Sequence, residues 1–171
     1  HDFVCKVNAD IIGKVVNIAS RCAGFINKFF ENTLSECVHN QNLVKVFHMS
    51  HKEITEFFEK RNFSQALRVV MHLANKVNQY VNTYRPWHLI KEEDQKKTVH
   101  EVCSLAINLF KIICGYLKPI MPQLSLKVEK FLNIDKIKWV DIPNILTDHK
   151  INTFEQLIGR IDPKKVTAIL K

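Results

Sequence analysis

Helical periodicity constrains the fold of this chain more than any other feature, and it begins within the first helix-length of sequence. From Phe3 to Phe30, apolar or small residues recur at positions 4, 7, 11, 15, 18, 22, 25 and 29. Steps of three and four place these side chains on one face of an amphipathic helix. Asn32 and Thr33 follow and are expected to end it. The sequence therefore predicts a long first helix with one buried face.

A second and a third helix are predicted in the next stretch. Ser50–Glu53 reads as a capping box, so the second helix begins there, or earlier after Asn42, and ends near Arg61. Asn62 is a suitable cap for the third helix, which stops before Pro86 because the residue before a proline is disfavoured in a helix. The buried face of the third helix is expected to comprise Leu67, Val70, Met71, Ala74, Val77 and Val81.

The remaining segments predict two further helices and then an irregular tail. A fourth helix is expected over Glu92–Leu117, and a fifth, shorter one over Pro122–Leu132. Residues 136–146 are short, alternating and broken by a proline, which indicates loops. Thr153–Gln156 is another possible capping box, and Asp162–Pro163 suits the start of a last short helix. The apolar side of the fourth helix comprises Leu105, Leu109, Ile112, Ile113 and Tyr116.

This pattern predicts an all-α fold: a bundle of about five helices in one domain over residues 1–171, with residues 133–171 as an irregular C-terminal extension. Strands that alternate with helices, as a nucleotide-binding α/β domain requires, are absent from the pattern. No run of about 18 apolar residues is present, so no membrane partner is expected. The first residue is not methionine, which indicates a piece of a longer protein.

The charge favours an acidic partner only weakly. The formal net charge is +8 and the isoelectric point is near 9.3, which suits nucleic acid or a membrane surface. However, the chain is rich in Lys, Asn and Ile together, and this bias produces a basic chain without any partner. Only five of the 25 Lys and Arg residues are arginines, so an arginine is more informative about a binding surface than a lysine is.

The cysteines predict reduced thiols and not a disulfide framework. Their number is odd, and none forms a C-x-x-C pair. Most lie among apolar helical residues, which is typical of buried thiols in a cytosolic protein. The five are Cys5, Cys22, Cys37, Cys103 and Cys114.

No pattern in the chain indicates catalysis. The phosphate-binding, dinucleotide-binding and zinc-protease motifs are all missing, and only four glycines are present. His48 and His51 share a helix face, but such a pair is usually solvated. We therefore predict no catalytic residue, no metal site and no cofactor in this chain.

A candidate recognition surface lies beside the apolar stripe of the first helix. Asn17 and Arg21 sit at the flank of that stripe, about 75–115° from its centre on a helical wheel. An amide offers a donor and an acceptor, and a guanidinium offers a planar fork of donors. One turn apart, the two side chains can read the edges of one or two bases. The alternative is an ordinary solvated helix face.

Trp87 gives a second candidate. It follows Pro86 at the predicted end of the third helix, where a rigid aromatic side chain can stack on an unpaired base. Arg85 and Lys91 flank it and supply positive charge for phosphates. The alternative is a tryptophan that packs into the core as a lid on the bundle.

Four stretches of the chain carry a family resemblance. VNADIIGKVVNIASRCAGFINKFF, YVNTYRPWHLIK, YLKPIMPQLSLKVEKFLN and INTFEQLIGRID, in this order, resemble the anticodon-binding domain of bacterial methionyl-tRNA synthetases. The resemblance covers essentially the whole chain. It implies that Asn17, Arg21 and Trp87 read the anticodon. A weaker RNA-binding role is assigned to the nearby cations Lys14, Arg85 and Lys91.

The resemblance also implies what this chain lacks and what it binds. The catalytic Rossmann domain of these class I enzymes, which uses ATP with Mg and methionine, carries two signatures that are absent here. The expected partners are the CAU anticodon loop of a tRNA and the catalytic domain of the same enzyme, in the cytoplasm, and no aminoacylation by this chain alone is expected. The stretch from Ile151 onwards resembles a segment that folds back toward the catalytic domain. The alternatives are the helical anticodon domain of the isoleucine, valine, leucine or cysteine enzymes, and a helical protein-interaction scaffold.

Overall fold

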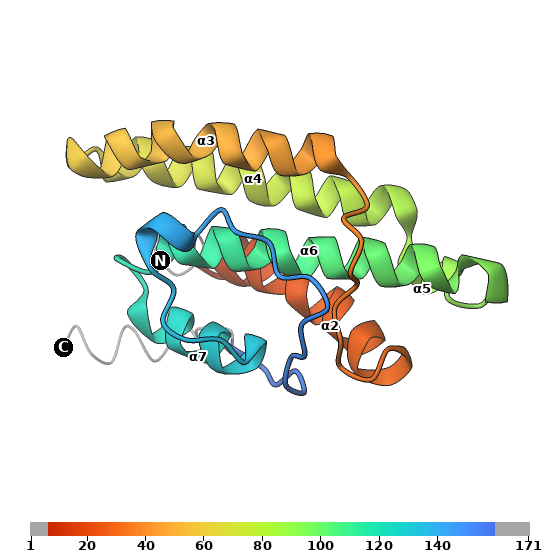
Figure 1. Ribbon diagram of the computed structural model, residues 1–171. Helices are drawn as coiled ribbons and strands as arrows, with labels where there is room; N and C mark the ends of the chain where they lie inside the picture. The colour runs from red at the N-terminus through yellow and green to blue at the C-terminus, as the bar shows by residue number, and fades with distance from the viewer. Residues whose placement is uncertain (1–6, 160–171) are drawn as a thin grey trace.

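The computed structural model describes residues 7–159, which form a bundle of helices (Figure 1). The π-helix η1 runs directly into α2, so the two form one continuous helical segment, and α3 and α4 form an antiparallel pair packed above α6 (Figure 1). The elements are η1 Val7–Val16, α2 Asn17–Phe29, α3 Gln41–Glu59, α4 Phe63–Tyr84, α5 Pro86–Leu89, η2 Glu93–Gln95, α6 Lys96–Leu117, α7 Pro122–Leu132 and η3 Trp139–Asp141. The predicted all-α fold is confirmed.

The core is built around α6. Every residue from Val102 to Leu117 is buried, because α2 and α4 pack along this helix and the other elements surround it. In the described part of the chain, one helical stretch, Glu93–Leu117, is long and apolar enough to cross a membrane, but 83% of its apolar window is buried inside the bundle. The predicted apolar side of this helix is buried throughout.

One cation is buried on this central helix. Lys111 is only 4% exposed, and its ammonium donates to the backbone carbonyls of Ile142 at 3.2 Å and Asn144 at 2.6 Å. Burial lowers the pKa of Lys111 to about 8, and the nearby Asp141 opposes that shift. The lysine thereby holds the loop after α7 against α6.

Two predicted helices have the expected ends. Asn62 caps α4, and its side-chain oxygen accepts from the backbone N–H of Gln65. The helix ends at Tyr84 because Arg85 takes the left-handed conformation, with φ 48°, immediately before Pro86. The fifth predicted helix, Pro122–Leu132, is α7. Of the six predicted buried positions on α4, Val70, Ala74, Val77 and Val81 are buried, whereas Leu67 and Met71 are half-buried.

The prediction that the second helix begins at a capping box at Ser50–Glu53 was wrong. The helix begins at Gln41, where Asn40 caps it by accepting from the N–H of Leu43 at 2.9 Å. The alternative start after Asn42 was therefore nearly right. Ser50 lies in mid-helix and donates its hydroxyl to a backbone carbonyl one turn earlier, at 2.9 Å. A serine can satisfy its hydroxyl in this way, so the box pattern alone does not locate a helix start.

The first helix differs from the prediction in type and in its buried face. Its first part, η1, is a π-helix, in which hydrogen bonds run from residue i to i+5. Farther along, Ile26 takes a core position, whereas Phe29, predicted to be buried, is 42% exposed and stacks on Phe25. Gly13 is exposed and lies within η1. The helix at that position is therefore a π-helix and not a regular α-helix.

Residues 151–159, here called the strap, carry no helix, so the capping box predicted at Thr153–Gln156 was also wrong. The strap instead makes backbone contacts with other elements. The N–H of Asn152 donates to the carbonyl of Phe131 at 2.8 Å, and the N–H of Phe154 donates to Asn27 Oδ1 at 3.0 Å. The strap therefore lies against both α7 and α2. The last helix predicted at Asp162–Pro163 lies outside the described residues.

Candidate nucleic-acid interface

Arg21 and Trp87, which lie 66 positions apart in the sequence, meet on the surface of the bundle. Arg21 projects from α2, and its Cζ lies 4.6 Å from the centroid of the Trp87 ring on α5. A guanidinium at this distance from an indole is attracted to the ring quadrupole. The structure thus brings two of the three predicted base-reading residues together.

The end of α4 determines the position of Trp87. The left-handed residue Arg85 reverses the chain, and its carbonyl then accepts from the N–H of His88 at 2.8 Å. Pro86 starts the short helix α5 and is itself buried. Trp87 is half-buried, with part of its ring packed against the core. It is therefore neither a fully buried lid nor free of the bundle.

Asn82 is a member of this cluster that the sequence did not reveal. Arg21 Nη2 donates to Asn82 Oδ1 at 2.6 Å, across the interface between α2 and α4. Because the guanidinium is held by this bond, its plane is oriented beside the indole of Trp87. Asn82 is an exposed polar residue on an amphipathic helix, and only the packing of α4 against α2 distinguishes it from its neighbours.

Asn17 lies one turn before Arg21, at the first position of α2, and is half-buried. Its backbone carbonyl accepts from the Ser20 hydroxyl at 3.1 Å. Asn17 lines a cavity of about 410 Å³ whose other wall includes Phe154 and Gln156 of the strap. Asn17 therefore lies one turn from Arg21, next to a hollow that sequence spacing did not predict.

The weaker candidates surround this cluster. The Lys14 ammonium pairs with Asp10 at 2.6 Å, so part of its charge is engaged within η1. Arg85 and Lys91 are exposed on either side of Trp87. Gly24 is exposed on α2, and a Cβ added there would meet no atom within 4 Å. Its neighbours in the bundle therefore do not require a glycine.

The two histidines have separate partners. His48 Nε2 hydrogen-bonds the carbonyl of Pro143 at 2.9 Å, and His51 Nδ1 hydrogen-bonds the Tyr116 hydroxyl at 3.0 Å. Burial, and then His48, lower the pKa of His51. The expectation of a solvated pair was wrong for His51, which is half-buried. Over residues 7–159, no group of three His, Cys, Asp or Glu side chains could hold a metal ion.

The described cysteines are free thiols, and most are buried as predicted. Cys22, Cys103 and Cys114 lie in the core, whereas Cys37 is exposed. A hydrogen bond with Cys22, and then burial, raise the pKa of Cys103, and burial raises the pKa of Cys114. Thiolate chemistry is therefore disfavoured at both of these thiols. Cys5 lies outside the described residues.

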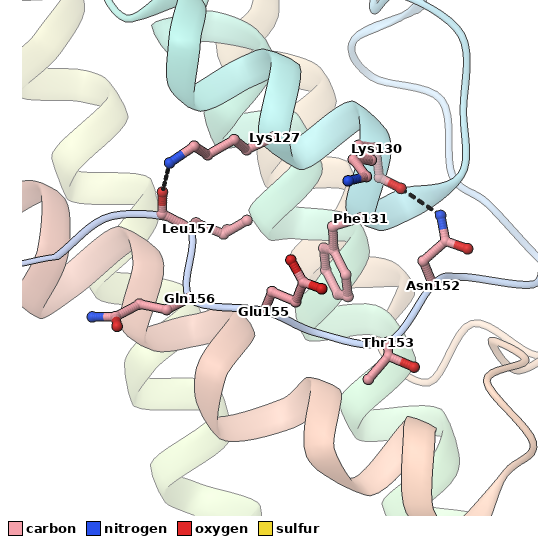
Figure 2. A pocket seen from close by; sticks show the side chains of 8 residues that line it. All are labelled: Lys127, Lys130, Phe131, Asn152, Thr153, Glu155, Gln156 and Leu157. Atoms are coloured by element: carbon pink, nitrogen blue, oxygen red, sulfur yellow. Dashed lines mark hydrogen bonds between the residues drawn. The ribbon is translucent and has the colours of Figure 1, made fainter.

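A further cavity of about 450 Å³ lies between α7 and the strap (Figure 2). Lys127 Nζ donates to the Leu157 carbonyl at 2.8 Å, and Asn152 Nδ2 donates to the Lys130 carbonyl at 2.6 Å (Figure 2). These bonds hold the strap to α7. None of the predicted base-reading residues lines this cavity.

Known proteins resemble this chain in both sequence and fold. The family described as the anticodon binding domain of methionyl tRNA ligase matches residues 33–165. The methionine–tRNA ligase of Francisella tularensis subsp. holarctica strain OSU18 is 51% identical over 170 residues, which are 99% of this chain and 25% of that protein. The methionine–tRNA ligase of Vesicomyosocius okutanii is 46% identical over 170 residues, 99% of this chain and 31% of that protein.

Solved structures show the same fold. The apo form of methionyl-tRNA synthetase from Mycobacterium tuberculosis superposes with a TM-score of 0.83 at 16% identity, over 94% of this chain and 34% of that one. The methionyl-adenylate-bound form gives a TM-score of 0.81, also at 16% identity, over 91% and 33% of the two chains. This chain spans about a quarter to a third of the length of the curated relatives named above. It belongs to the family of anticodon-binding domains of methionyl-tRNA ligase.

Proposed function

We propose that this chain selects a tRNA by binding its CAU anticodon loop, with Trp87 stacking on the first anticodon base. The observation that carries the proposal is the meeting of Arg21 and Trp87, with Cζ 4.6 Å from the ring centroid. Proteins read single-stranded RNA loops by stacking splayed bases on aromatic or arginine planes and by hydrogen-bonding their edges. The cluster combines both kinds of plane with the amide groups of Asn17 and Asn82 nearby.

The proposal places this chain inside a larger enzyme. The relatives are methionine–tRNA ligases of which the chain covers about a quarter to a third, so the parent is expected to charge tRNA with methionine using ATP and Mg. The cytoplasm is the expected compartment, and the catalytic domain of the parent is the expected intramolecular partner. We expect this chain alone to form no adenylate when ATP and methionine are added, and pyrophosphate exchange measures this directly.

A titration with a fluorescent anticodon stem-loop tests the proposed function. The wild-type chain is expected to bind the CAU loop more tightly than a UAU loop, in which the first anticodon base is changed. Trp87→Ala should weaken CAU binding by about tenfold or more, since stacking contributes roughly 1–3 kcal/mol per base. Equal binding of the two loops by the wild-type chain would contradict the proposal.

A second tryptophan provides the control for this titration. Trp139 lies in a separate aromatic cluster, with its indole N–H donating to Thr55 Oγ1 at 3.0 Å and its ring 5.1 Å from that of Phe58. In Trp139→Phe, the affinity for CAU should be retained. Because part of the Trp87 ring packs against the core, Trp87→Ala should also lower the melting temperature, so the titration is made at a temperature at which a melting curve shows the variant to be folded.

A further inference from the structure

A histidine outside the candidate interface contacts the end of the helix that leads to Trp87. His39 lies in the loop between α2 and α3, and its Nδ1 hydrogen-bonds the Tyr80 hydroxyl at 3.0 Å. Its ring also meets the ring of Tyr84 edge-on, at 90° and with the centroids 4.7 Å apart. Tyr84 is the last residue of α4. One side chain therefore makes two contacts within the last turns of this helix.

The loop that carries His39 is itself anchored to the bundle. The N–H of Leu34 donates to the His149 carbonyl at 2.8 Å, and the N–H of Ser35 donates to Ser104 Oγ on α6 at 2.8 Å. Two residues after His39 the loop enters α3, and the start of α3 and the end of α4 lie at the same end of the bundle (Figure 1). Because the loop is fixed on both sides of it, His39 is a firm support for the end of α4.

The last turns of α4 have open space on another side. Tyr80 and Tyr84 line a cavity of about 430 Å³ between the first turns of α3 and the last turns of α4. The two tyrosine rings lie 5.1 Å apart, and His39 adds an aromatic contact from outside the helix. Burial, and then Tyr84, raise the pKa of Tyr80, so its hydroxyl keeps the proton of the hydrogen bond. Without His39, the ring of Tyr84 would have room to move.

A movement of Tyr84 would reach Trp87 through a short and stiff piece of chain. Arg85, the next residue, is in the left-handed conformation, and its N–H donates to the Val81 carbonyl at 2.9 Å. Pro86 follows, is buried, and has its φ fixed at about −65° by its ring. Few dihedral angles are therefore free between Tyr84 and Trp87, and a tilt of the last turn of α4 would displace the indole.

We propose that His39 is a positioning residue for RNA binding, which holds the end of α4 at the tilt at which Trp87 meets Arg21. It does so through its two contacts with Tyr80 and Tyr84. This inference rests on the proposed function. His39 acts through the ring of Trp87 and not by contact with a base.

Two measurements on the whole chain test this inference. The first is the fluorescence of Trp87 in a Trp139→Phe parent, where Trp87 is the sole tryptophan. Adding His39→Ala should shift the emission and increase quenching by acrylamide, because the ring is held less firmly. The second is the pair of dissociation constants for the CAU and UAU stem-loops. His39→Ala should weaken CAU binding several-fold and reduce the preference for CAU over UAU.

His39→Asn tests the hydrogen bond separately from the ring. An asparagine amide offers both a donor and an acceptor, so a bond to the Tyr80 hydroxyl can form without the imidazole. The CAU affinity and the Trp87 emission of this variant should lie between those of His39→Ala and the parent. Values no closer to the parent than those of His39→Ala would contradict the role given to this bond.

His51→Ala is the matched control. His51 Nδ1 also hydrogen-bonds a tyrosine hydroxyl, that of Tyr116, at 3.0 Å, and the two ring centroids lie 5.7 Å apart. Tyr116 is near the C-terminal end of α6, whereas α5 precedes the start of that helix. His51→Ala should therefore lower the stability of the bundle but leave the emission of Trp87 and the CAU/UAU preference at the parent values.

All variants are measured at a temperature at which melting curves show them to be folded. An unchanged Trp87 emission or an unchanged CAU affinity in His39→Ala would overturn this inference and leave the proposed function standing. Equal effects of His39→Ala and His51→Ala would also overturn it, because both would then act through the stability of the whole bundle. If the parent does not distinguish CAU from UAU, the proposed function fails, and an emission shift in His39→Ala alone would still support the positioning of Trp87.

Discussion

Arg21 has two partners on neighbouring helices, and this arrangement makes the hydrogen bond to Asn82 testable. The bond is 2.6 Å long and orients the guanidinium beside Trp87. In Asn82→Ala the arginine should sample more rotamers, so binding of the CAU loop should weaken by several-fold, which corresponds to the roughly 1 kcal/mol of a typical hydrogen bond. Asn75→Ala, at an exposed position two turns earlier on α4, should leave binding unchanged.

Lys111 predicts a pH dependence of stability. Burial lowers its pKa to about 8, whereas an unfolded lysine has a pKa of about 10.4. Between these two values the unfolded chain binds more protons than the folded chain. The contribution of Lys111 to the free energy of unfolding therefore rises with pH in this window and is least favourable below pH 8.

The measurement compares the wild-type chain with Lys111→Met by urea unfolding at several pH values. The difference in unfolding free energy, wild type minus variant, should increase by up to about 1.4 kcal/mol per pH unit between about pH 8 and 10.4. Subtracting the variant removes the tyrosines and cysteines that titrate in the same range. A difference that does not change with pH would show that the buried ammonium keeps an ordinary pKa.

The residues of the candidate site were predictable to different degrees. Asn17 and Arg21 could be found because a helical wheel places them at the flank of the apolar stripe, and Trp87 because it follows a helix-ending proline. The contact between Arg21 and Trp87 could not be found, because it depends on how α2 packs against the end of α4. Asn82 gave no signal, since it is one of several exposed polar residues on α4.

At the scale of the element, the two asparagine caps offer a matched pair of variants. Asn40 Oδ1 accepts from the N–H of Leu43 at 2.9 Å, whereas Asn62 Oδ1 accepts from the N–H of Gln65 at 3.4 Å. Each substitution by Ala should destabilise the chain, typically by about 1 kcal/mol, and the shorter bond should make Asn40→Ala the larger loss. Urea unfolding with unchanged m-values measures both, and an equal or reversed order would contradict the ranking.

The helices were predictable where a strong breaker or cap bounds them, and less so elsewhere. Pro86 and Pro122 sharpen the limits of α4 and α7, because a proline lacks the N–H that a helix interior needs. The start of α3 was ambiguous, since both Ser50 and Asn42 offered cap-like residues within one continuous helix. The π-helical form of η1 has no signature in the apolar spacing.

At the scale of the whole molecule, the basic charge predicts how binding depends on salt. The affinity for the stem-loop should fall on a logarithmic plot with a slope of about −0.7 for each single-strand phosphate neutralised. Arg85→Ala should make the slope less steep by about 0.7 if this side chain pairs with one phosphate.

Arg61→Ala is a close control for this salt series. Arg61 and Arg85 are both exposed and both have positive φ, 57° and 48°, at opposite ends of α4. Replacing either by alanine therefore removes one charge from a left-handed position. The slope should stay at the wild-type value in Arg61→Ala. Equal changes in the two variants would mean that RNA responds to the net charge and not to a local surface.

The passage from π-helix to α-helix just before Asn17 has a consequence for the orientation of Arg21. Where hydrogen bonds change from i→i+5 to i→i+4, the helix ladder skips one carbonyl, and Asn78 Nδ2 on α4 supplies a donor to the Lys14 carbonyl at 3.0 Å. One turn farther along α4, Asn82 holds Arg21. A shift of one residue in register would turn every side chain of α2 by about 100° and carry Arg21 away from Trp87. Asn78 thus contacts the backbone where the two helix types join, one turn of α4 before the residue that holds Arg21.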